Sequence, residues 1–142
     1  MDIRPLTETY AVSPQIDPAD LPAIKAAGYG TVIDNRPDGE IPPDLQTEAM
    51  RAAAEAAGLV FVANPVIGGA LTEANVTAQA AALAAATGPV LAYCASGNRS
   101  SIVWALAHAA EVPADDLIAT AARQGYNLEH LRGMLDRLAG RA

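Results

Sequence analysis

Short runs of apolar and β-branched residues alternate along this 142-residue chain with longer segments whose apolar residues recur at helical spacing. The short runs predict strands over residues 7–13, 31–34, 59–63 and 89–94. The longer segments predict helices over residues 18–27, 45–57, 72–87 and 102–110, and two more that begin near residues 113 and 127. This alternation is typical of a mainly parallel sheet covered on both faces. We therefore expect an α/β fold, a single three-layer domain whose mostly parallel sheet of four or five strands is flanked by helices.

Capping residues set several of the predicted helix ends. Asp17 followed by Pro18 is typical of a helix start, and Gly28 is a C-terminal stop. Thr72 is the predicted N-cap of the helix over 72–87. The segment 102–110 is apolar almost all round, which predicts a central and buried helix. The last helix is expected to bury one apolar stripe, made of Leu128, Leu131, Met134, Leu135 and Leu138.

Composition narrows the class of protein but not the reaction. The chain is 51% hydrophobic and 18% charged and contains no repeat or linker, which predicts one globular domain over residues 1–142. The formal charge of −7 argues against nucleic acid and membrane surfaces as partners, because both bind basic patches. The start lacks a signal-peptide pattern and no run reaches membrane-spanning length, so we expect a cytoplasmic protein. A single cysteine excludes an internal disulfide and fits a reducing compartment.

The only cysteine, Cys94, ends the predicted strand 89–94 and is followed by a small polar loop that leads into a helix. A loop that curls in this position points its amides toward one centre, and the helix N-terminus adds partial positive charge. The amides expected to bind an anion are those of Ala95, Ser96, Gly97 and Asn98. Such surroundings stabilise the thiolate, which is the reactive form of cysteine. Cys94 is therefore the predicted nucleophile.

Arg99 and Ser100 complete the predicted catalytic loop. The planar guanidinium of Arg99 can clamp two oxygens of an oxyanion and favour the Cys94 thiolate. Ser100 can donate a hydrogen bond to that thiolate or to a departing sulfur. The two histidines, His108 and His130, have no accompanying acids or thiols at metal-ligand spacing. We therefore predict no metal and no other cofactor.

A second polar loop, residues 35–43, follows the predicted strand 31–34. It should reach the same edge of the sheet as Cys94, because the carboxyl ends of parallel strands meet there. Arg36 is a candidate anion-binding residue in this loop, as a second cation or a gate. Asp38 is a candidate proton donor. The same residues also suit a simple turn.

The pattern Cys-x-x-Gly-x-Arg-Ser at residues 94–100 resembles the active loop of rhodanese-type sulfurtransferases. With one more residue between cysteine and arginine, it would resemble that of cysteine-dependent protein phosphatases. Over nearly its whole length the chain resembles the phosphatase-like domain of beta-lactamase hydrolase-like proteins, and the matching segments are residues 10–15, 27–40, 57–61 and 94–100. The resemblance implies the topology of the dual-specificity and tyrosine phosphatase superfamily.

Three functions would use the same loop. Cys94 could carry sulfane sulfur as a persulfide, form a phosphocysteine, or belong to a non-catalytic domain that binds or senses an anion. Two features favour sulfur transfer. Only four residues separate Cys94 from Arg99, as in sulfurtransferases, and the loop 64–71 contains no carboxylate that could protonate a leaving oxygen.

We therefore expect a cysteine-dependent sulfurtransferase of sulfide or thiosulfate metabolism, with a cysteine phosphatase as the alternative. The expected substrates are small anions or persulfides such as thiosulfate and glutathione persulfide, and association with sulfide-oxidising enzymes is a further expectation. The alternative reaction takes a phosphoester.

Overall fold

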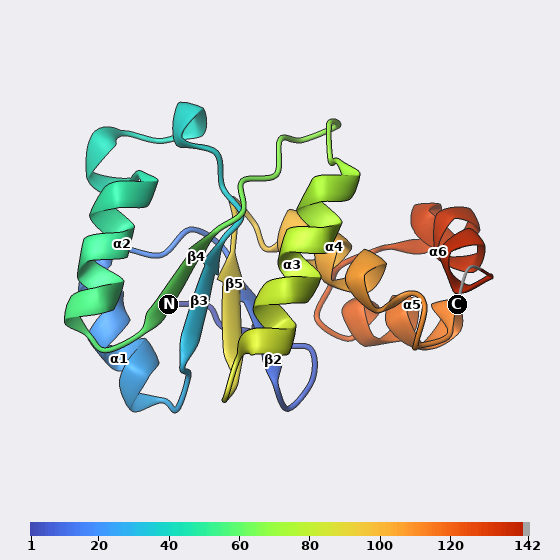
Figure 1. Ribbon diagram of the computed structural model, residues 1–142, viewed down its shortest axis with the longest axis horizontal. Helices are drawn as coiled ribbons and strands as arrows, with labels where there is room; N and C mark the ends of the chain where they lie inside the picture. The colour runs from blue at the N-terminus through green and yellow to red at the C-terminus, as the bar shows by residue number, and fades with distance from the viewer. Residues whose placement is uncertain (141–142) are drawn as a thin grey trace.

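Five strands form one sheet in the computed structural model, which describes residues 1–140 (Figure 1). Their order in space is β1-β2-β5-β3-β4, with β1 antiparallel to β2 and every other pair parallel. The strand carrying Cys94 at its end is therefore central. The strands are β1 (Arg4–Pro5), β2 (Tyr10–Ser13), β3 (Thr31–Asp34), β4 (Val60–Ala63) and β5 (Val90–Tyr93).

Helices cover both faces of this sheet, which makes three layers. In Figure 1, α1 and α2 lie on one side of the strands, α3 and α4 on the other, and α5 and α6 beyond α4. The predicted α/β class and its mainly parallel sheet are thus confirmed. None of the described helices is both long and apolar enough to cross a membrane. The helices are α1 (Leu21–Ala26), α2 (Thr47–Ala56), α3 (Glu73–Ala85), α4 (Asn98–His108), α5 (Ala114–Ala122) and α6 (Arg132–Ala139).

Side chains of the central strands alternate between two hydrophobic cores. One core lies under α4, α5 and α6 and includes Trp104, and the other lies under α1 and α2 and includes Met50. In β5, Ala92 joins the first core while its neighbours Leu91 and Tyr93 join the second. Because side chains on both faces of β5 are buried, packing fixes the position and direction of this strand. It thereby also fixes the position of Cys94, the residue directly after it.

The structure shifts several predicted boundaries. The strand predicted over 7–13 begins only at Tyr10, because the amides of Leu6 and Thr7 both donate to the Tyr10 carbonyl in a turn. The short β1 was not predicted, since two residues carry no readable alternation. The helix predicted from residue 102 begins at Asn98, within the polar loop. The apolar stripe of the last helix is also wrong in part, because the Met134 side chain is 43% exposed.

Candidate active site

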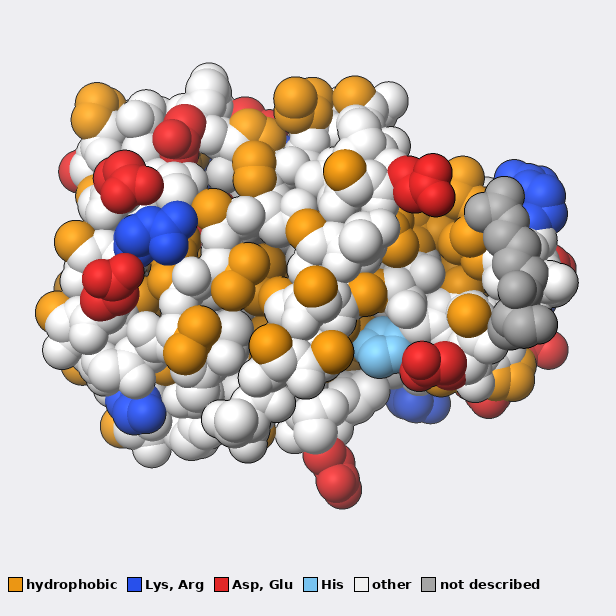
Figure 2. All heavy atoms as spheres, in the orientation of Figure 1, with side chains coloured by type: hydrophobic (Ala, Val, Ile, Leu, Met, Phe, Trp, Pro, Cys, Tyr) orange, Lys and Arg blue, Asp and Glu red, His pale blue; other side chains and the backbone are white. Residues whose placement is uncertain are grey.

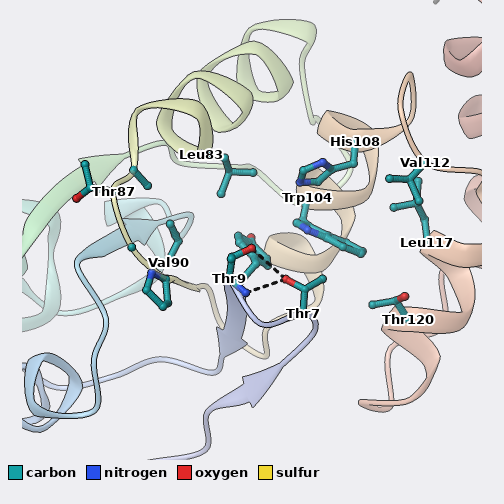
Figure 3. A pocket seen from close by; sticks show the side chains of 14 residues that line it. Thr7, Thr9, Leu83, Thr87, Val90, Trp104, His108, Val112, Leu117 and Thr120 are labelled. Carbon is teal, nitrogen blue, oxygen red and sulfur yellow. Dashed lines mark hydrogen bonds between the residues drawn. The ribbon is translucent and has the colours of Figure 1, made fainter.

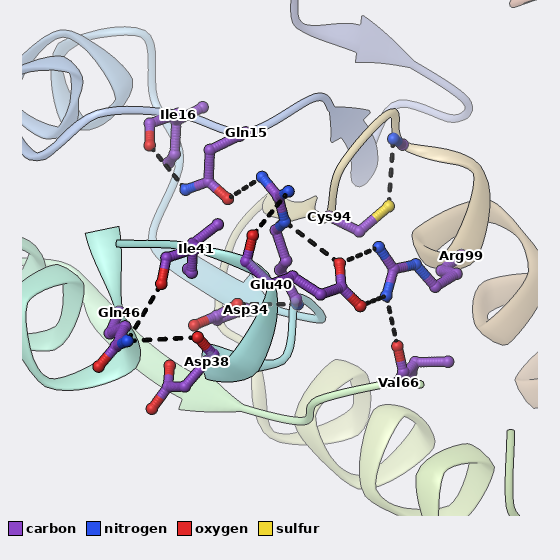
Figure 4. Close-up of polar contacts among 12 residues, drawn as sticks. Gln15, Ile16, Asp34, Asp38, Glu40, Ile41, Gln46, Val66, Cys94 and Arg99 are labelled. Atoms are coloured by element: carbon purple, nitrogen blue, oxygen red, sulfur yellow. Dashed lines mark hydrogen bonds and ion pairs between the residues drawn. The ribbon is translucent and has the colours of Figure 1, made fainter. Parts of the chain in front are cut away.

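The Cys94 sulfur lies at the base of a tight loop between β5 and α4. Cys94 is 1% exposed, and its Sγ accepts a hydrogen bond from the Gly97 amide at 3.1 Å (Figure 4). Gly97 has a φ of 95°, the left-handed region that favours glycine, and α4 begins at the next residue. The chain therefore curls around the sulfur before it enters the helix, as the sequence predicts.

Tyr126, from the segment after α5, closes the outer side of this curl. Its hydroxyl donates to the Ser96 carbonyl at 2.8 Å. A Cβ at position 97 would collide with the same hydroxyl. Gly97 is thus required for two separate reasons, its backbone conformation and the close approach of Tyr126.

Four amides, two in the loop and two in the first turn of α4, have no protein acceptor within the described part of the chain. The two amides between them are paired: the Gly97 amide donates to Cys94 Sγ, and the Asn98 amide donates to Ser96 Oγ at 3.2 Å. Unpaired amides are costly unless water or a ligand satisfies them, and they cluster here at the start of an 11-residue helix. The arrangement is that of an anion site. The unpaired amides belong to Ala95, Ser96, Arg99 and Ser100.

The Arg99 guanidinium lies beside this loop and is held by residues of two other loops. Nη1 donates to Glu40 Oε2 and to the Val66 carbonyl, both at 2.7 Å, and Nη2 donates to Glu40 Oε1 at 2.7 Å. Three of the five guanidinium N–H groups are therefore in use. The Nε–H and one Nη2–H, which form a second edge of the fork, have no oxygen acceptor among residues 1–140 and stay available to an anion.

Glu40 is bound by a second cation as well. Arg36 Nε lies 3.3 Å from Glu40 Oε1, and Arg36 Nη1 donates to Gln15 at 3.2 Å. The hydrogen bonds from Arg99 are the main reason that the pKa of Glu40 is lowered, against an opposing contribution from burial and with Arg36 adding to the effect. Hydrogen bonding to Glu40, and the nearby Cys94 sulfur, raise the pKa of Arg99. Glu40 is therefore ionised at neutral pH and is a poor proton donor.

The Asp38 carboxylate, a predicted proton donor, makes its hydrogen bond to the start of α2 and not to the Cys94 loop. It accepts the Thr47 amide at 2.7 Å and so caps the N-terminus of α2. Figure 4 shows it beside Gln46, with Glu40 lying between it and Arg99. The expected role of Asp38 as an acid thus stays a prediction, and the structure gives this carboxylate a capping contact instead.

Asp34, at the end of β3, anchors the loop that carries Arg36 and Glu40. It accepts the Arg36 amide and the Thr47 hydroxyl, both at 2.9 Å, which ties the two ends of the loop together. Burial raises the pKa of Asp34, and these hydrogen bonds partly oppose that shift. Glu40 is consequently presented to Arg99 from an anchored loop.

Ser100 does not donate to Cys94 in this structure. Its hydroxyl donates to Asn35 Oδ1 at 2.9 Å, and its carbonyl accepts the Tyr10 hydroxyl at 2.8 Å. Asn35 in turn donates to the carbonyl of Asn64 and to the side chain of Gln79. This buried polar network fixes the first turn of α4 to the ends of β3 and β4 and to α3.

Three members of the network, Asn35, Asn64 and Gln79, were not singled out as candidates from the sequence. Asn35 and Asn64 each follow directly after a strand, a position that could have drawn attention to them. Gln79 lies within an alanine-rich helix and is nevertheless fully buried, with its side-chain oxygen accepting from both asparagines. Glu40 was visible in the polar loop, but nothing in the sequence paired it with Arg99.

The described residues include no group of three or more His, Cys, Asp or Glu side chains placed to hold a metal ion. A cavity of about 530 Å³ lies at the other end of the sheet, lined by Thr9, Val90, Trp104 and His108 among others (Figure 3). No residue of the Cys94 loop contributes to it. The chemistry-bearing groups are therefore gathered at the carboxyl ends of the parallel strands and not in this cavity.

Comparisons with known proteins agree with this geometry. A sequence model of the family described as "Beta-lactamase hydrolase-like protein, phosphatase-like domain" matches residues 2–111. The beta-lactamase hydrolase-like protein of Xylella fastidiosa strain 9a5c is 34% identical over 141 residues. That match covers 98% of this chain and 33% of the relative, so the chain spans about a third of that protein's length.

Solved structures of phosphatases share this fold. A candidate phosphatase from Neisseria meningitidis Z2491 matches with a TM-score of 0.81 and 35% identity, over 97% of this chain and 99% of that chain. Kinase-associated phosphatase, which has a catalytic-site cysteine, shares the fold with a TM-score of 0.73 and 15% identity, over 92% of this chain and 87% of its own. The cysteine-phosphatase topology that the resemblance implies is confirmed. The chain belongs to the family of phosphatase-like domains of beta-lactamase hydrolase-like proteins.

Proposed function

We propose that this domain is a cysteine-dependent phosphatase that hydrolyses a phosphoester through a phosphocysteine intermediate. The observation that carries the proposal is the set of four unpaired amides within the six residues that follow Cys94, together with the free edge of Arg99. These donors suit the equatorial oxygens of a phosphoryl group in transfer. The phosphatase fold of the related structures supports this choice over sulfur transfer, which the comparisons do not support.

In the proposed reaction, the Cys94 thiolate attacks phosphorus and the bond from phosphorus to the leaving oxygen breaks. Water then attacks phosphorus, the S–P bond breaks, and inorganic phosphate leaves with the thiolate restored. The loop amides and Arg99 stabilise the charge on the phosphoryl oxygens in both steps. Arg36 does not contact Arg99 directly but pairs with Glu40, which does. Its charge adds to the positive potential near the site.

The loop 64–71, next to the site, contains no carboxylate, Glu40 is held ionised, and Asp38 caps α2. A leaving oxygen would therefore depart as an anion or take its proton from water. A positioned acid ordinarily contributes about 10²–10⁴ in rate. We accordingly propose substrates whose leaving group is a stable anion, such as aryl phosphates, and a steep fall in rate as the leaving-group pKa rises.

Sulfur transfer is the second candidate, favoured by the four-residue spacing between Cys94 and Arg99 and by the missing acid. With thiosulfate, Cys94 would attack the outer sulfur, the S–S bond would break, and sulfite would leave without needing a proton. The persulfide sulfur would then pass to cyanide or a thiol. An association with sulfide-oxidising enzymes is a prediction that belongs to this second candidate, whereas the cytoplasmic location stays a prediction from the sequence under either reaction.

Parallel assays decide between the two reactions. We expect release of phosphate from an aryl phosphate and no thiocyanate from thiosulfate plus cyanide. The Cys94→Ser variant should lose turnover to background while binding inorganic phosphate within about threefold of the parent, because only the nucleophile changes. Thiocyanate formation without phosphate release would reverse the assignment. Turnover that survives in Cys94→Ser would show that neither reaction belongs to this site.

A further inference from the structure

A groove of about 310 Å³ opens directly beside the anion site. Its floor is α4, where Arg99, Ile102 and Leu106 fall on one helix face at spacings of three and four residues. One wall is the loop that contains Val66 and Ile67, and the other is the start of α6 with the turn before it. The groove therefore runs from the guanidinium of Arg99 into apolar surroundings.

The connection to the anion site is built by a single side chain. Arg99 donates to the Val66 carbonyl at 2.7 Å, so its guanidinium links the floor of the groove to one of its walls. The free edge of the same guanidinium is the one available to an anion. A phosphoryl group held by Arg99 would consequently have this groove next to it as space for whatever is attached to phosphorus.

The lining indicates the chemistry of that attached group. Four described large hydrophobic side chains are notably exposed, and two of them, Ile67 at 60% and Met134 at 43%, border this groove. No carboxylate lines it, and His130 is the only ionisable lining group besides Arg99. Figure 2 shows hydrophobic side chains gathered between the start of α3 and α6, with an acidic side chain at the edge of the patch. An uncharged apolar group would gain most from binding here.

The size of the groove limits the occupant further. Small-molecule sites span about 300–1,000 Å³, so this groove is at the lower end of that range. It has room for one ring or a short chain and not for a folded partner. We propose that the groove binds the apolar substituent of the substrate, so that the domain acts on small aryl or alkyl phosphoesters; the inference rests on the proposed function.

Binding of phosphonates tests this without turnover, because their C–P bond is not hydrolysed. The measurement is protection of Cys94, the only cysteine, from alkylation by iodoacetamide. Methylphosphonate, phenylphosphonate and 4-butylphenylphosphonate form a series with one anion and a growing apolar group. We expect phenylphosphonate to bind at least tenfold more tightly than methylphosphonate, and each further methylene that enters the groove to add up to about fourfold.

The variant Ile67→Ser combined with Met134→Ser should remove most of the advantage of phenyl over methyl while leaving methylphosphonate binding unchanged. Val60→Ser is the matched control, because Val60 is also 60% exposed but lies on β4 and does not line the groove. Equal binding of methyl- and phenylphosphonate, or an advantage untouched by the double variant, would overturn the inference. A phenyl advantage that the double variant removes, in a protein that fails to hydrolyse aryl phosphates, would support the groove and refute the phosphatase proposal alone.

Discussion

Glu40 and Arg99 form a two-point ion pair, with both oxygen–nitrogen distances at 2.7 Å, across 59 residues of sequence. The contact uses the terminal edge of the guanidinium and leaves the Nε edge toward the Cys94 loop. Bidentate pairing fixes the plane of the guanidinium as well as its position. Glu40 is therefore best understood as a residue that positions Arg99 and not as a stand-in for the substrate anion.

Glu40→Gln tests this positioning role. Glutamine keeps one acceptor oxygen but loses the charge and the second acceptor, so Arg99 should become less well oriented. We expect inorganic phosphate to bind about three- to tenfold more weakly, in line with the loss of one charge-assisted hydrogen bond. Isothermal titration with phosphate measures the effect. The matched control is Glu111→Gln, which removes an exposed carboxylate in the turn after α4 and should leave phosphate binding unchanged.

An increase in phosphate affinity in Glu40→Gln would indicate a different role for Glu40. If Glu40 competed with the anion for Arg99, its neutralisation would tighten phosphate binding. Tighter binding by Glu40→Gln, with Glu111→Gln unchanged, would thus contradict the positioning role and identify an inhibitory contact.

The lowered pKa of Glu40 predicts a specific dependence of stability on pH. Because the pKa in the folded state lies below the ordinary value, the ion pair stabilises the fold at pH values above that ordinary value. The contribution is lost as the pH falls through the lowered pKa. The Glu40 side chain is 34% exposed, so we expect less than about 1 kcal/mol from the pair. Urea unfolding of the parent and of Glu40→Gln, compared at pH 7 and pH 3, should show a stability difference at pH 7 that becomes smaller at pH 3.

The sequence predicts the Cys94 loop well because its parts are contiguous. Strand, glycine, arginine and helix follow one another within a few residues, and local sterics dictate how such a segment curls. The class of fold is equally readable, since strand and helix periodicities alternate along the chain. These features depend on neighbours in sequence and need no knowledge of tertiary contacts.

The remaining site residues depend on contacts between distant segments. Ser100 illustrates the difference, because its place in the loop suggests a donor to Cys94 whereas its hydroxyl bonds Asn35, 65 residues away. Gln79 likewise bonds Tyr10 of β2 and the residues directly after β3 and β4, Asn35 and Asn64, which no local pattern connects to α3. Such partners follow only from the strand order, which places β5 between β2 and β3.

Gly97→Ala should disrupt the loop for two separable reasons. The left-handed backbone strains any residue with a side chain, and the new methyl group meets the Tyr126 hydroxyl. We expect a loss of about 1–3 kcal/mol in unfolding free energy and strongly weakened phosphate binding. Adding Tyr126→Phe should recover part of the loss by removing the closest of these contacts, although the ring carbon Cζ, 2.9 Å from the new Cβ, still has to shift. Gly88→Ala is the control, because position 88 has open space and no positive φ; a Gly97→Ala variant as stable as this control would refute the argument.

The hydrogen bond from Ser100 to Asn35 separates two roles for Ser100. If Ser100 serves by fixing the first turn of α4, Ser100→Ala should lower kcat about three- to tenfold, and Asn35→Ala, which also breaks hydrogen bonds to Asn64 and Gln79, should lower it at least as much. The double variant should then be little worse than Asn35→Ala alone, with a coupling free energy of about 1 kcal/mol. All three are assayed on an aryl phosphate well below their melting temperatures. If Ser100 instead donates to the Cys94 sulfur during the reaction, Ser100→Ala alone should lower kcat sharply while Asn35→Ala has little effect, and the two effects should add.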